Sequence, residues 1–430
     1  MTAQTADHAI FERRESEARS YCRSFPTSFT KAQGSILTDA SGREYIDFLA
    51  GCSSLNYGHN DPDMKAALIE HIQADGITHG LDMFTDTKAE FLQAFEDKIL
   101  KPRGMDHKVM MTGPTGTNAV EAAMKLARKV TGRKNIIAFT NGFHGMTLGA
   151  LACTGNQGKR DGAGTGAPLC GTSRMPYDGA FGDDVDTLKQ IEIMLDNPSS
   201  GVDTPAAFIV EPVQGEGGLN AASREWLEGI SRLAKKHGAM LIIDDIQSGC
   251  GRTGTFFSFE DWDVDADMIT MAKSFSGMGL PFAALLIKPE HDIWKPAEHN
   301  GTFRGNTHAF VTARVAIEKF WSDDTFQSAV QRKAKLVEDR FKAIADFLPG
   351  ASLKGRGMMR GIDVGSGDLA GDICAKAFDN GLIIETSGAH DEVVKFLGAL
   401  TTPDDVLNKG FDILEAAARE CAQNHKIAAE

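Results

Sequence analysis

The sequence predicts an α/β protein in which helices cover a mostly parallel sheet and a smaller α+β domain follows. Two observations support this prediction. Short apolar runs alternate with helical patterns through residues 135–288, which is the order that builds parallel sheets. After residue 311, long helical stretches surround a glycine-punctuated segment at 354–365, and this change is typical of a second domain.

Apolar runs bounded by turn residues define the strands. They lie at residues 135–139, 206–213, 239–245, 267–273 and 283–288. Helical patterns stand between them, with apolar side chains three and four residues apart; the clearest are 119–130 and 224–238. Functional groups of such sheets gather at the carboxyl ends of the strands, so we expect the site there.

Three parts are predicted along the chain. Residues 1–50 form an N-terminal segment, with a hairpin around Ser41-Gly42, that packs with the small domain. Residues 51–310 form the large domain, and residues 311–430 form the C-terminal small domain.

Composition excludes several classes of protein. The 430 residues carry a net charge of −14, which argues against a nucleic-acid partner. The N-terminus is polar, with charges of both signs, and no apolar run approaches the roughly 20 residues of a membrane span. Seven scattered cysteines without a C-x-x-C pair indicate free thiols in a reducing compartment. We expect a cytoplasmic protein that binds neither nucleic acid nor membrane.

Two strand ends carry residues suited to chemistry. Asp244 and Asp245 end the run at 239–245, and burying a lone carboxylate is costly without a cation. Lys273 ends the next strand, where a partly desolvated amine can form a Schiff base with an aldehyde. The plain alternative for Lys273 is a side chain whose amine reaches solvent. We expect Asp245 to be structural.

A glycine turn at 113–116 precedes a helix that we expect to begin near Ala119, with Asn118 as its cap and Glu121 closing a capping box. Free N–H groups at this start, together with the hydroxyl of Thr117, suit a phosphate. Ordinary helix capping is the plain alternative.

Phe143 and His144 follow the strand at 135–139, between Gly142 and Gly145. A phenyl ring held on such a turn can lie flat over a planar ligand, although a core aromatic is the plain alternative. His144 suits either a general base or a hydrogen-bonded polar residue, and the sequence leaves both open.

Pyridoxal 5'-phosphate carries the groups that these features accommodate. Its aldehyde suits Lys273, its phosphate suits the turn at 113–116, and its ring suits Phe143. Its pyridine nitrogen must stay protonated to draw electrons, and Asp244 would hold that proton. The residues expected to contact this cofactor are Gly116, Thr117, Phe143, His144, Asp244, Ile246, Gln247 and Lys273.

A G-x-G-x-x-G pattern at 249–254 suggests a competing function, that of a nicotinamide-dependent oxidoreductase. A true dinucleotide fingerprint lies directly between a strand and a helix. Here residues 244–248 intervene and the aromatic stretch 255–262 follows, so this function is disfavoured. No H-E-x-x-H motif or zinc-type cysteine spacing is present, and no catalytic metal is predicted.

Several segments resemble successive motifs of the class III pyridoxal-phosphate aminotransferases. They are "TGPTGTNAVEAAMKLAR" (112–128), "NGFHGMTLGAL" (141–151), "VEPVQGEGG" (210–218), "LIIDDIQSGCGRTGTFFSFE" (241–260) and "DMITMAKSFSGMG" (267–279). The resemblance covers residues 30 to 405. It implies fold type I of the pyridoxal-phosphate-dependent transferases, with a mostly parallel seven-stranded sheet in the large domain.

The resemblance also implies individual roles. Lys273 holds the cofactor and shuttles the proton, and Gln247 contacts the ring oxygen. Thr302 matches a threonine that reaches the phosphate of the neighbouring subunit, so a homodimer or a higher homo-oligomer is implied. Glu211 matches a glutamate that can neutralise a carboxylate-binding arginine.

One position departs from the family pattern. In "VVKFLGALTT", Lys395 stands where many relatives carry that arginine. Lysine offers a point charge in place of a bidentate fork. Either Lys395 or Arg304 is therefore expected to bind a substrate carboxylate.

Further stretches narrow the resemblance to one branch of the family. They are "SYCRSFPTSFTKAQGSILTD" (20–39), "LNYGHNDP" (55–62), "DGITHGLDM" (75–83) and "EHNGTFRGNTHAF" (298–310). The branch transfers the amino group of L-glutamate to L-aspartate 4-semialdehyde, reversibly giving L-2,4-diaminobutyrate and 2-oxoglutarate, in the first dedicated step of ectoine biosynthesis. The alternatives left open are an ω-aminotransferase of the ornithine, 4-aminobutyrate or acetylornithine type, and an aminomutase with the same cofactor.

Overall fold

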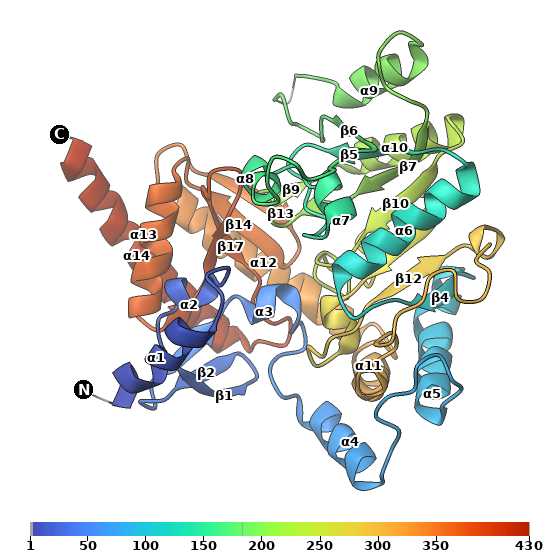
Figure 1. Cartoon of the computed structure of the whole chain (residues 1–430). Coiled ribbons are helices and arrows are strands. Elements are labelled where there is room, and N and C mark those ends of the chain that lie inside the picture. Colours follow the sequence, from blue (N-terminus) through green and yellow to red (C-terminus); the bar gives the residue numbers. More distant parts are fainter. Residues whose placement is uncertain (1–2, 183, 430) are drawn as a thin grey trace.

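The computed structural model describes residues 3–182 and 184–429, and a seven-stranded sheet lies within its larger part, on the right in Figure 1. The strand order is β4-β12-β11-β10-β7-β5-β6; β12 runs antiparallel to its neighbours, and the other pairs are parallel. The predicted fold class is confirmed. The strands are β4 (Lys108–Met111), β5 (Asn135–Phe139), β6 (Thr172–Met175), β7 (Pro205–Val210), β10 (Met240–Asp244), β11 (Met268–Met271) and β12 (Ala284–Ile287).

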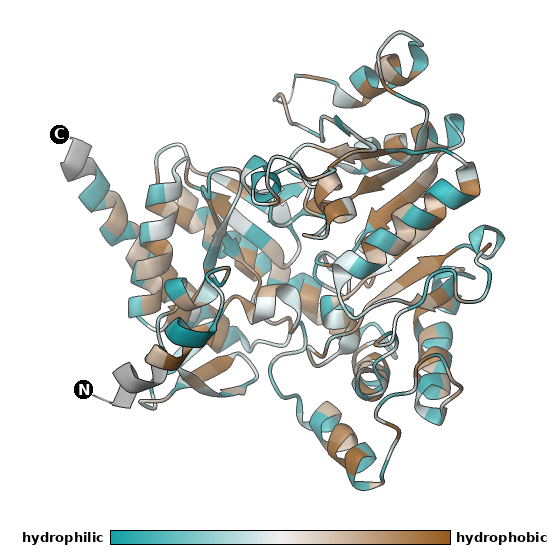
Figure 2. Cartoon of the chain, viewed as in Figure 1, coloured by the Kyte–Doolittle hydropathy of each residue, from teal (hydrophilic) through white to brown (hydrophobic). Residues whose placement is uncertain are grey.

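The central strands are buried on both faces, which explains their unbroken apolar runs. In β10, Leu241 and Ile243 join a core with α5, α9, α10 and α11, whereas Ile242 packs on the other face with α6. Figure 2 shows the apolar strands beneath the mixed surfaces of these helices. The helices are α5 (Asp86–Phe95), α6 (Gly116–Thr131), α9 (Thr187–Asp196), α10 (Arg224–Lys236) and α11 (Thr307–Phe320).

A second core lies in the C-terminal part of the chain, around a four-stranded antiparallel sheet of order β13-β14-β17-β16. Three helices, α12, α13 and α14, contribute to this core. The elements are α12 (Thr325–Ala345), β13 (Ser352–Arg356), β14 (Met359–Asp363), α13 (Gly367–Asp379), β16 (Glu385–Ser387), β17 (Val393–Phe396) and α14 (Asp404–Ala429).

The N-terminal segment joins this C-terminal part through a small sheet. Strand β3 (Glu44–Asp47) pairs in parallel with β15 (Leu382–Ile383), and Figure 1 shows the blue and red segments side by side. The predicted hairpin is confirmed, because β2 (Ile36–Asp39) pairs antiparallel with β3 and Gly42 takes a φ of 88° in the turn. The predicted domain boundaries at 50/51 and 310/311 stay predictions; the second falls inside α11.

The remaining elements are short or peripheral. They are α1 (Ala3–Arg14), α2 (Tyr21–Ser24), β1 (Phe29–Gln33), α3 (Ala50–Ser53), α4 (Pro62–Gln73), α7 (Leu148–Cys153), α8 (Gln157–Asp161), β8 (Val213–Gln214) and β9 (Asn220–Ala221), a π-turn at Glu96–Leu100, and 3-10 turns at Lys101–Arg103, Lys273–Ser276 and Pro289–His291. Within the described ranges, no helix combines the length and apolar character needed to cross a bilayer.

Two local predictions need correction. The helix expected from Ala119 begins at Gly116, and its cap is Thr115, which forms a capping box with Asn118. Glu121 instead accepts a hydrogen bond from the backbone N–H of Ala150 at 3.1 Å. The strand expected at 206–213 ends at Val210, and Val213 begins the separate strand β8.

Candidate active site

A cavity of about 510 Å³ opens at the carboxyl ends of β7, β10 and β11. Every residue expected to contact the cofactor lines it, except Thr302. The structure therefore brings together predicted residues that lie as far as 157 positions apart in the chain (from Gly116 to Lys273). A larger cavity of about 880 Å³ lies around Arg103 and Trp262, but it contains none of the predicted site residues.

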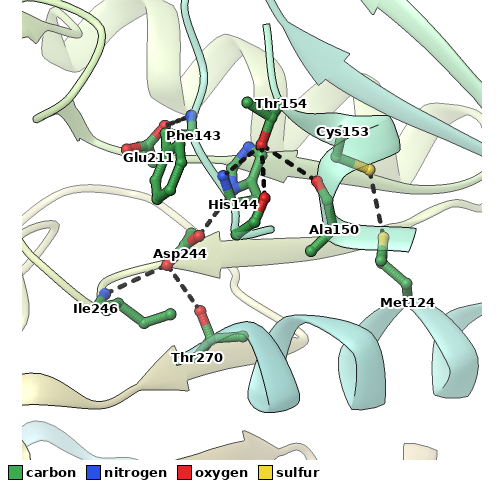
Figure 3. A network of polar contacts seen from close by, with 11 residues as sticks. Met124, Phe143, His144, Ala150, Cys153, Thr154, Glu211, Asp244, Ile246 and Thr270 are labelled. Atoms are coloured by element: carbon green, nitrogen blue, oxygen red, sulfur yellow. Dashed lines mark hydrogen bonds and ion pairs between the residues drawn. The ribbon is translucent and has the colours of Figure 1, made fainter. Parts of the chain in front are cut away.

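Asp244 ends β10 and is 4% exposed. Its Oδ2 lies 2.7 Å from His144 Nδ1, and its Oδ1 accepts hydrogen bonds from Thr270 Oγ1 at 3.0 Å and the Ile246 N–H at 3.4 Å (Figure 3). These partners fix the carboxylate at the cavity wall. Asp244 thus offers a positioned anion to a cationic ligand.

His144 is buried beside Asp244 and also lines the cavity (Figure 3). Burial alone would lower the pKa of His144, but the hydrogen bond and charge of Asp244, with the charge of Glu211, outweigh burial and raise it. The imidazole ring donates a hydrogen bond to Asp244 through Nδ1. Of the two roles that the sequence left open for His144, this contact fits the hydrogen-bonded polar residue.

Lys273 follows β11 at the start of a 3-10 turn and takes a φ of 53°. A left-handed conformation is uncommon for a residue with a side chain, and strain of this kind gathers at functional sites. Within the described residues, its Nζ forms no hydrogen bond or ion pair, although Lys273 lines the cavity. The side chain is therefore free to react with a bound ligand.

The turn before α6 also faces the cavity. A Cβ placed on Gly116 would lie 2.8 Å from Ile246 Cδ1, so a larger residue at this position would have to displace the Ile246 side chain. Thr117 Oγ1 lies 3.0 Å from Thr147 Oγ1. The start of α6, with its free N–H groups and the hydroxyls of Thr117 and Thr147, is the kind of site that binds phosphate.

Phe143 and Ile246 also line the cavity, and Lys159 Nζ lies 5.3 Å from the centre of the Phe143 ring. Gln247 Nε2 donates to Glu216 Oε1 at 3.3 Å and to the carbonyl of Cys52 at 3.4 Å. Asp245 points away from the cavity and accepts hydrogen bonds from Ser248 and Ser258, as expected of a structural residue.

Lys395 lies fully buried on β17 between two carboxylates. Its Nζ lies 2.9 Å from Glu216 Oε1 and 3.0 Å from Glu385 Oε1. Burial opposes the ammonium form, but the charges of Glu216 and Glu385 raise the pKa of Lys395 well above its usual value. Burial likewise opposes ionisation of Glu216, but Lys395 and Lys273 lower its pKa to about 2.

Glu211 does not pair with Lys395 in this structure, so its implied role toward a carboxylate-binding residue stays a prediction. Glu211 Oε2 accepts a hydrogen bond from the Phe143 N–H at 2.7 Å, and burial raises the pKa of Glu211 (Figure 3). The carboxylate that pairs with Lys395 is Glu216, in the same "VEPVQGEGG" stretch. The sequence did not predict Glu216, Glu385 or Thr270 as site residues. Only Glu216 could have been found from the sequence, because it lies between glycines that follow a predicted strand.

Thr302 and Arg304 lie away from this cavity. Thr302 is exposed in the loop before α11, and Arg304 pairs with Asp82 and donates to the carbonyl of His299 at 3.2 Å. Of the two predicted carboxylate-binding residues, only Lys395 is connected to the cavity, because it pairs with the lining residue Glu216.

Comparison with known proteins gives consistent matches. A protein of Halomonas elongata named diaminobutyrate–2-oxoglutarate transaminase is 57% identical over 415 residues, which are 96% of this chain and 98% of that protein. A protein of the same name from Bordetella parapertussis is 53% identical over 427 residues, covering 99% and 98%.

Solved structures agree in fold. An ornithine aminotransferase of Toxoplasma gondii, described with partial occupancy of PLP at its active site, superposes with a TM-score of 0.84 at 26% identity over 99% of this chain and 97% of that one. A transaminase of Virgibacillus gives 0.86 at 18% identity over 98% and 100%. Residues 18–418 match the model of the class-III aminotransferase family, and the chain belongs to that family.

Proposed function

We propose that this chain is a pyridoxal-phosphate-dependent aminotransferase that converts L-aspartate 4-semialdehyde and L-glutamate to L-2,4-diaminobutyrate and 2-oxoglutarate, reversibly, in ectoine biosynthesis. The observation that carries the proposal is the meeting of Lys273, Asp244 and the turn before α6 in one cavity. The name shared by relatives 53–57% identical over nearly the whole chain supports this substrate pair.

The cavity fits pyridoxal 5'-phosphate by three independent features. Gly116 and Thr117 line the cavity at the N-terminus of α6, where free N–H groups suit a phosphate. Asp244 is a buried carboxylate held by His144 and Thr270, and such a group suits a protonated ring nitrogen. Lys273 presents an amine without a partner among the described residues.

The residues take the following proposed roles. Lys273 would hold the cofactor and move the proton at the reacting carbon. Phe143 and Ile246 would pack on the two faces of the ring, and Gln247 would reach its oxygen. When bound, the cofactor supplies the aldehyde and the electron sink of the reaction. His144 is a positioning residue because it acts through Asp244.

Lys395 is the proposed anchor for substrate carboxylates. Its charge is masked by Glu216, so a carboxylate could bind only where Glu216 moves aside. Such a displaceable partner suits the reaction, since glutamate presents a distal carboxylate and the semialdehyde presents a carboxylate beside an ammonium. Arg304 is proposed to bind a substrate carboxylate only if it acts at the cavity of a neighbouring subunit.

A homodimer is also proposed. Thr302 lies outside the cavity of its own chain, and its neighbour Phe303 is 68% exposed, so this loop is available to a second copy. Seven cysteines without a disulfide support a reducing, cytoplasmic location. Sedimentation of the purified protein would test the dimer.

A screen of amino donors and acceptors on purified enzyme tests the function. L-glutamate with L-aspartate 4-semialdehyde should give the highest kcat/KM, scored by release of 2-oxoglutarate. Preference for ornithine, acetylornithine or 4-aminobutyrate would instead place the chain among other ω-aminotransferases. Isomerisation of one amino acid without an acceptor would indicate an aminomutase.

A further inference from the structure

The cluster formed by Glu216, Lys395 and Glu385 contains one cation and two anions in a buried place. Lys395 is fully buried, and the side chains of Glu216 and Glu385 are 28% and 14% exposed. With both carboxylates ionised, the cluster carries one net negative charge. Burying a net charge is costly, so the second carboxylate needs a reason beyond holding Lys395.

Glu385 reaches Lys395 by strand register. The two residues are direct partners in the antiparallel pair β16–β17, and side chains at such positions lie on one face of the sheet. Glu385 Oε1 lies 3.0 Å from Lys395 Nζ and has no second donor among the described residues. It therefore retains lone pairs for a further N–H donor.

Glu385 is connected to the cavity through Glu216, because both carboxylates pair with Lys395. Glu216 lines the cavity together with Lys273. Burial raises the pKa of Glu385, and the positive charges of Lys395 and Lys273 oppose that rise. A ligand that reacts at Lys273 could thus place its distal end against this cluster.

The two proposed amino donors differ at that distal end. Glutamate reacts at its α-amine and presents one carboxylate. Diaminobutyrate reacts at its terminal amine and presents a carboxylate together with a second ammonium. Lys395 suits the carboxylate of either compound, whereas only the diamino compound has a cation for the additional acid.

We propose that Glu385 determines specificity by accepting a hydrogen bond from the second ammonium group of the diamino acid. The inference rests on the proposed function and names a residue for one of its two substrate pairs. Glu385 should favour diaminobutyrate and disfavour glutamate, because its charge competes with the distal carboxylate of glutamate for Lys395.

The test uses holoenzyme carrying Glu385→Gln, which keeps the size of the side chain and removes its charge. We would measure kcat/KM for L-glutamate and for L-2,4-diaminobutyrate, each with a saturating acceptor. The ratio of glutamate to diaminobutyrate should rise about tenfold or more, the loss typical of one hydrogen bond to a charged group. Glu385→Asp, which keeps the charge, should raise the ratio less.

Glu338→Gln is the matched control, since it removes one charge from a partly buried ion pair with Arg360 in the same part of the chain; it should leave the ratio unchanged. A rise of less than about tenfold in Glu385→Gln overturns the inference alone. Wild-type enzyme that fails to turn over diaminobutyrate overturns the proposed function together with it.

Discussion

The Nδ1 atom of His144 lies 2.7 Å from Oδ2 of Asp244, and both side chains are buried at the carboxyl edge of the central sheet. The hydrogen bond supplies one of three donors to Asp244; the others are Thr270 Oγ1 and the Ile246 N–H. Because Asp244 can turn neither toward solvent nor toward another cation, its free surface faces the cavity.

Replacing His144 should therefore reduce the rate through Asp244. His144→Ala should lower kcat about tenfold, the loss expected for a charge-assisted hydrogen bond. His144→Asn, which places an N–H donor near Nδ1, should recover most of it. The measurement is kcat against pH for both variants; a purely structural role would lower the thermal midpoint but leave the pH profile of the folded enzyme unchanged.

Loss of the Lys273 amine should abolish catalysis. Lys273→Ala should remove measurable turnover and the yellow colour that borohydride bleaches, since no other described lysine lines this cavity. The control is Lys288→Ala, which removes a lysine at the end of the neighbouring strand, where it pairs with Asp267 at 3.3 Å. Turnover by Lys273→Ala within about tenfold of wild type would refute the assignment.

Lys395 should matter more for substrate affinity than for folding alone. Lys395→Met leaves two facing carboxylates, so the KM for glutamate should rise about tenfold and stability should fall by about 3 kcal/mol. Lys333→Met removes another buried lysine, whose Nζ donates to the Leu400 carbonyl at 2.9 Å. This control should cost about 1 kcal/mol and leave KM unchanged; equal KM values in the two variants would contradict the anchor role.

Asp245 gives a pH-dependent prediction. Burial raises its pKa to about 6, although Ser258 and Ser248 donate hydrogen bonds to it. The unfolded value is about 4, so folding favours the protonated form, and this contribution is lost as pH rises through 6. In urea unfolding, the stability of wild type relative to Asp245→Asn should be about 1 kcal/mol greater at pH 5 than at pH 8. A difference that grew toward pH 8 would exclude this account.

The strands that the sequence predicted are those buried on both faces. Strand β10 (Met240–Asp244) is wholly buried and apolar up to its last residue, so its pattern is visible without the structure. Strands β4 and β6 were missed because they are the edge strands of the sheet, where exposure permits residues such as Lys108 and Arg174.

The cofactor residues were predictable for a related reason. Asp244 and Lys273 end apolar strands, and parallel strands bring their carboxyl ends together. The pairing of Lys395 with Glu385 was not predictable, because the two residues face each other only through the register of β16 on β17. Register depends on pairing between strands, which a single sequence does not state.

Arg252 joins three parts of the chain next to the site. It is fully buried and donates to Ser53 Oγ at 3.0 Å, Asn56 Oδ1 at 2.6 Å and the Gly398 carbonyl at 2.7 Å. No carboxylate pairs with it among the described residues, and burial lowers its pKa to about 9. The guanidinium is thus held by neutral oxygen atoms alone.

These contacts extend to the reacting lysine. Ser274, which follows Lys273, donates to the Ser53 carbonyl at 2.7 Å and accepts from the Asn56 N–H at 2.9 Å. Arg252→Met should cost at least about 3 kcal/mol of stability, since several buried acceptors lose their donor, and should raise KM by loosening residues 53–56. Arg133→Met is the control: Arg133 donates to three backbone carbonyls, those of Pro205, His237 and Gly238, outside the cavity lining. It should lower the thermal midpoint without changing KM, and a KM unchanged in Arg252→Met as well would limit Arg252 to folding.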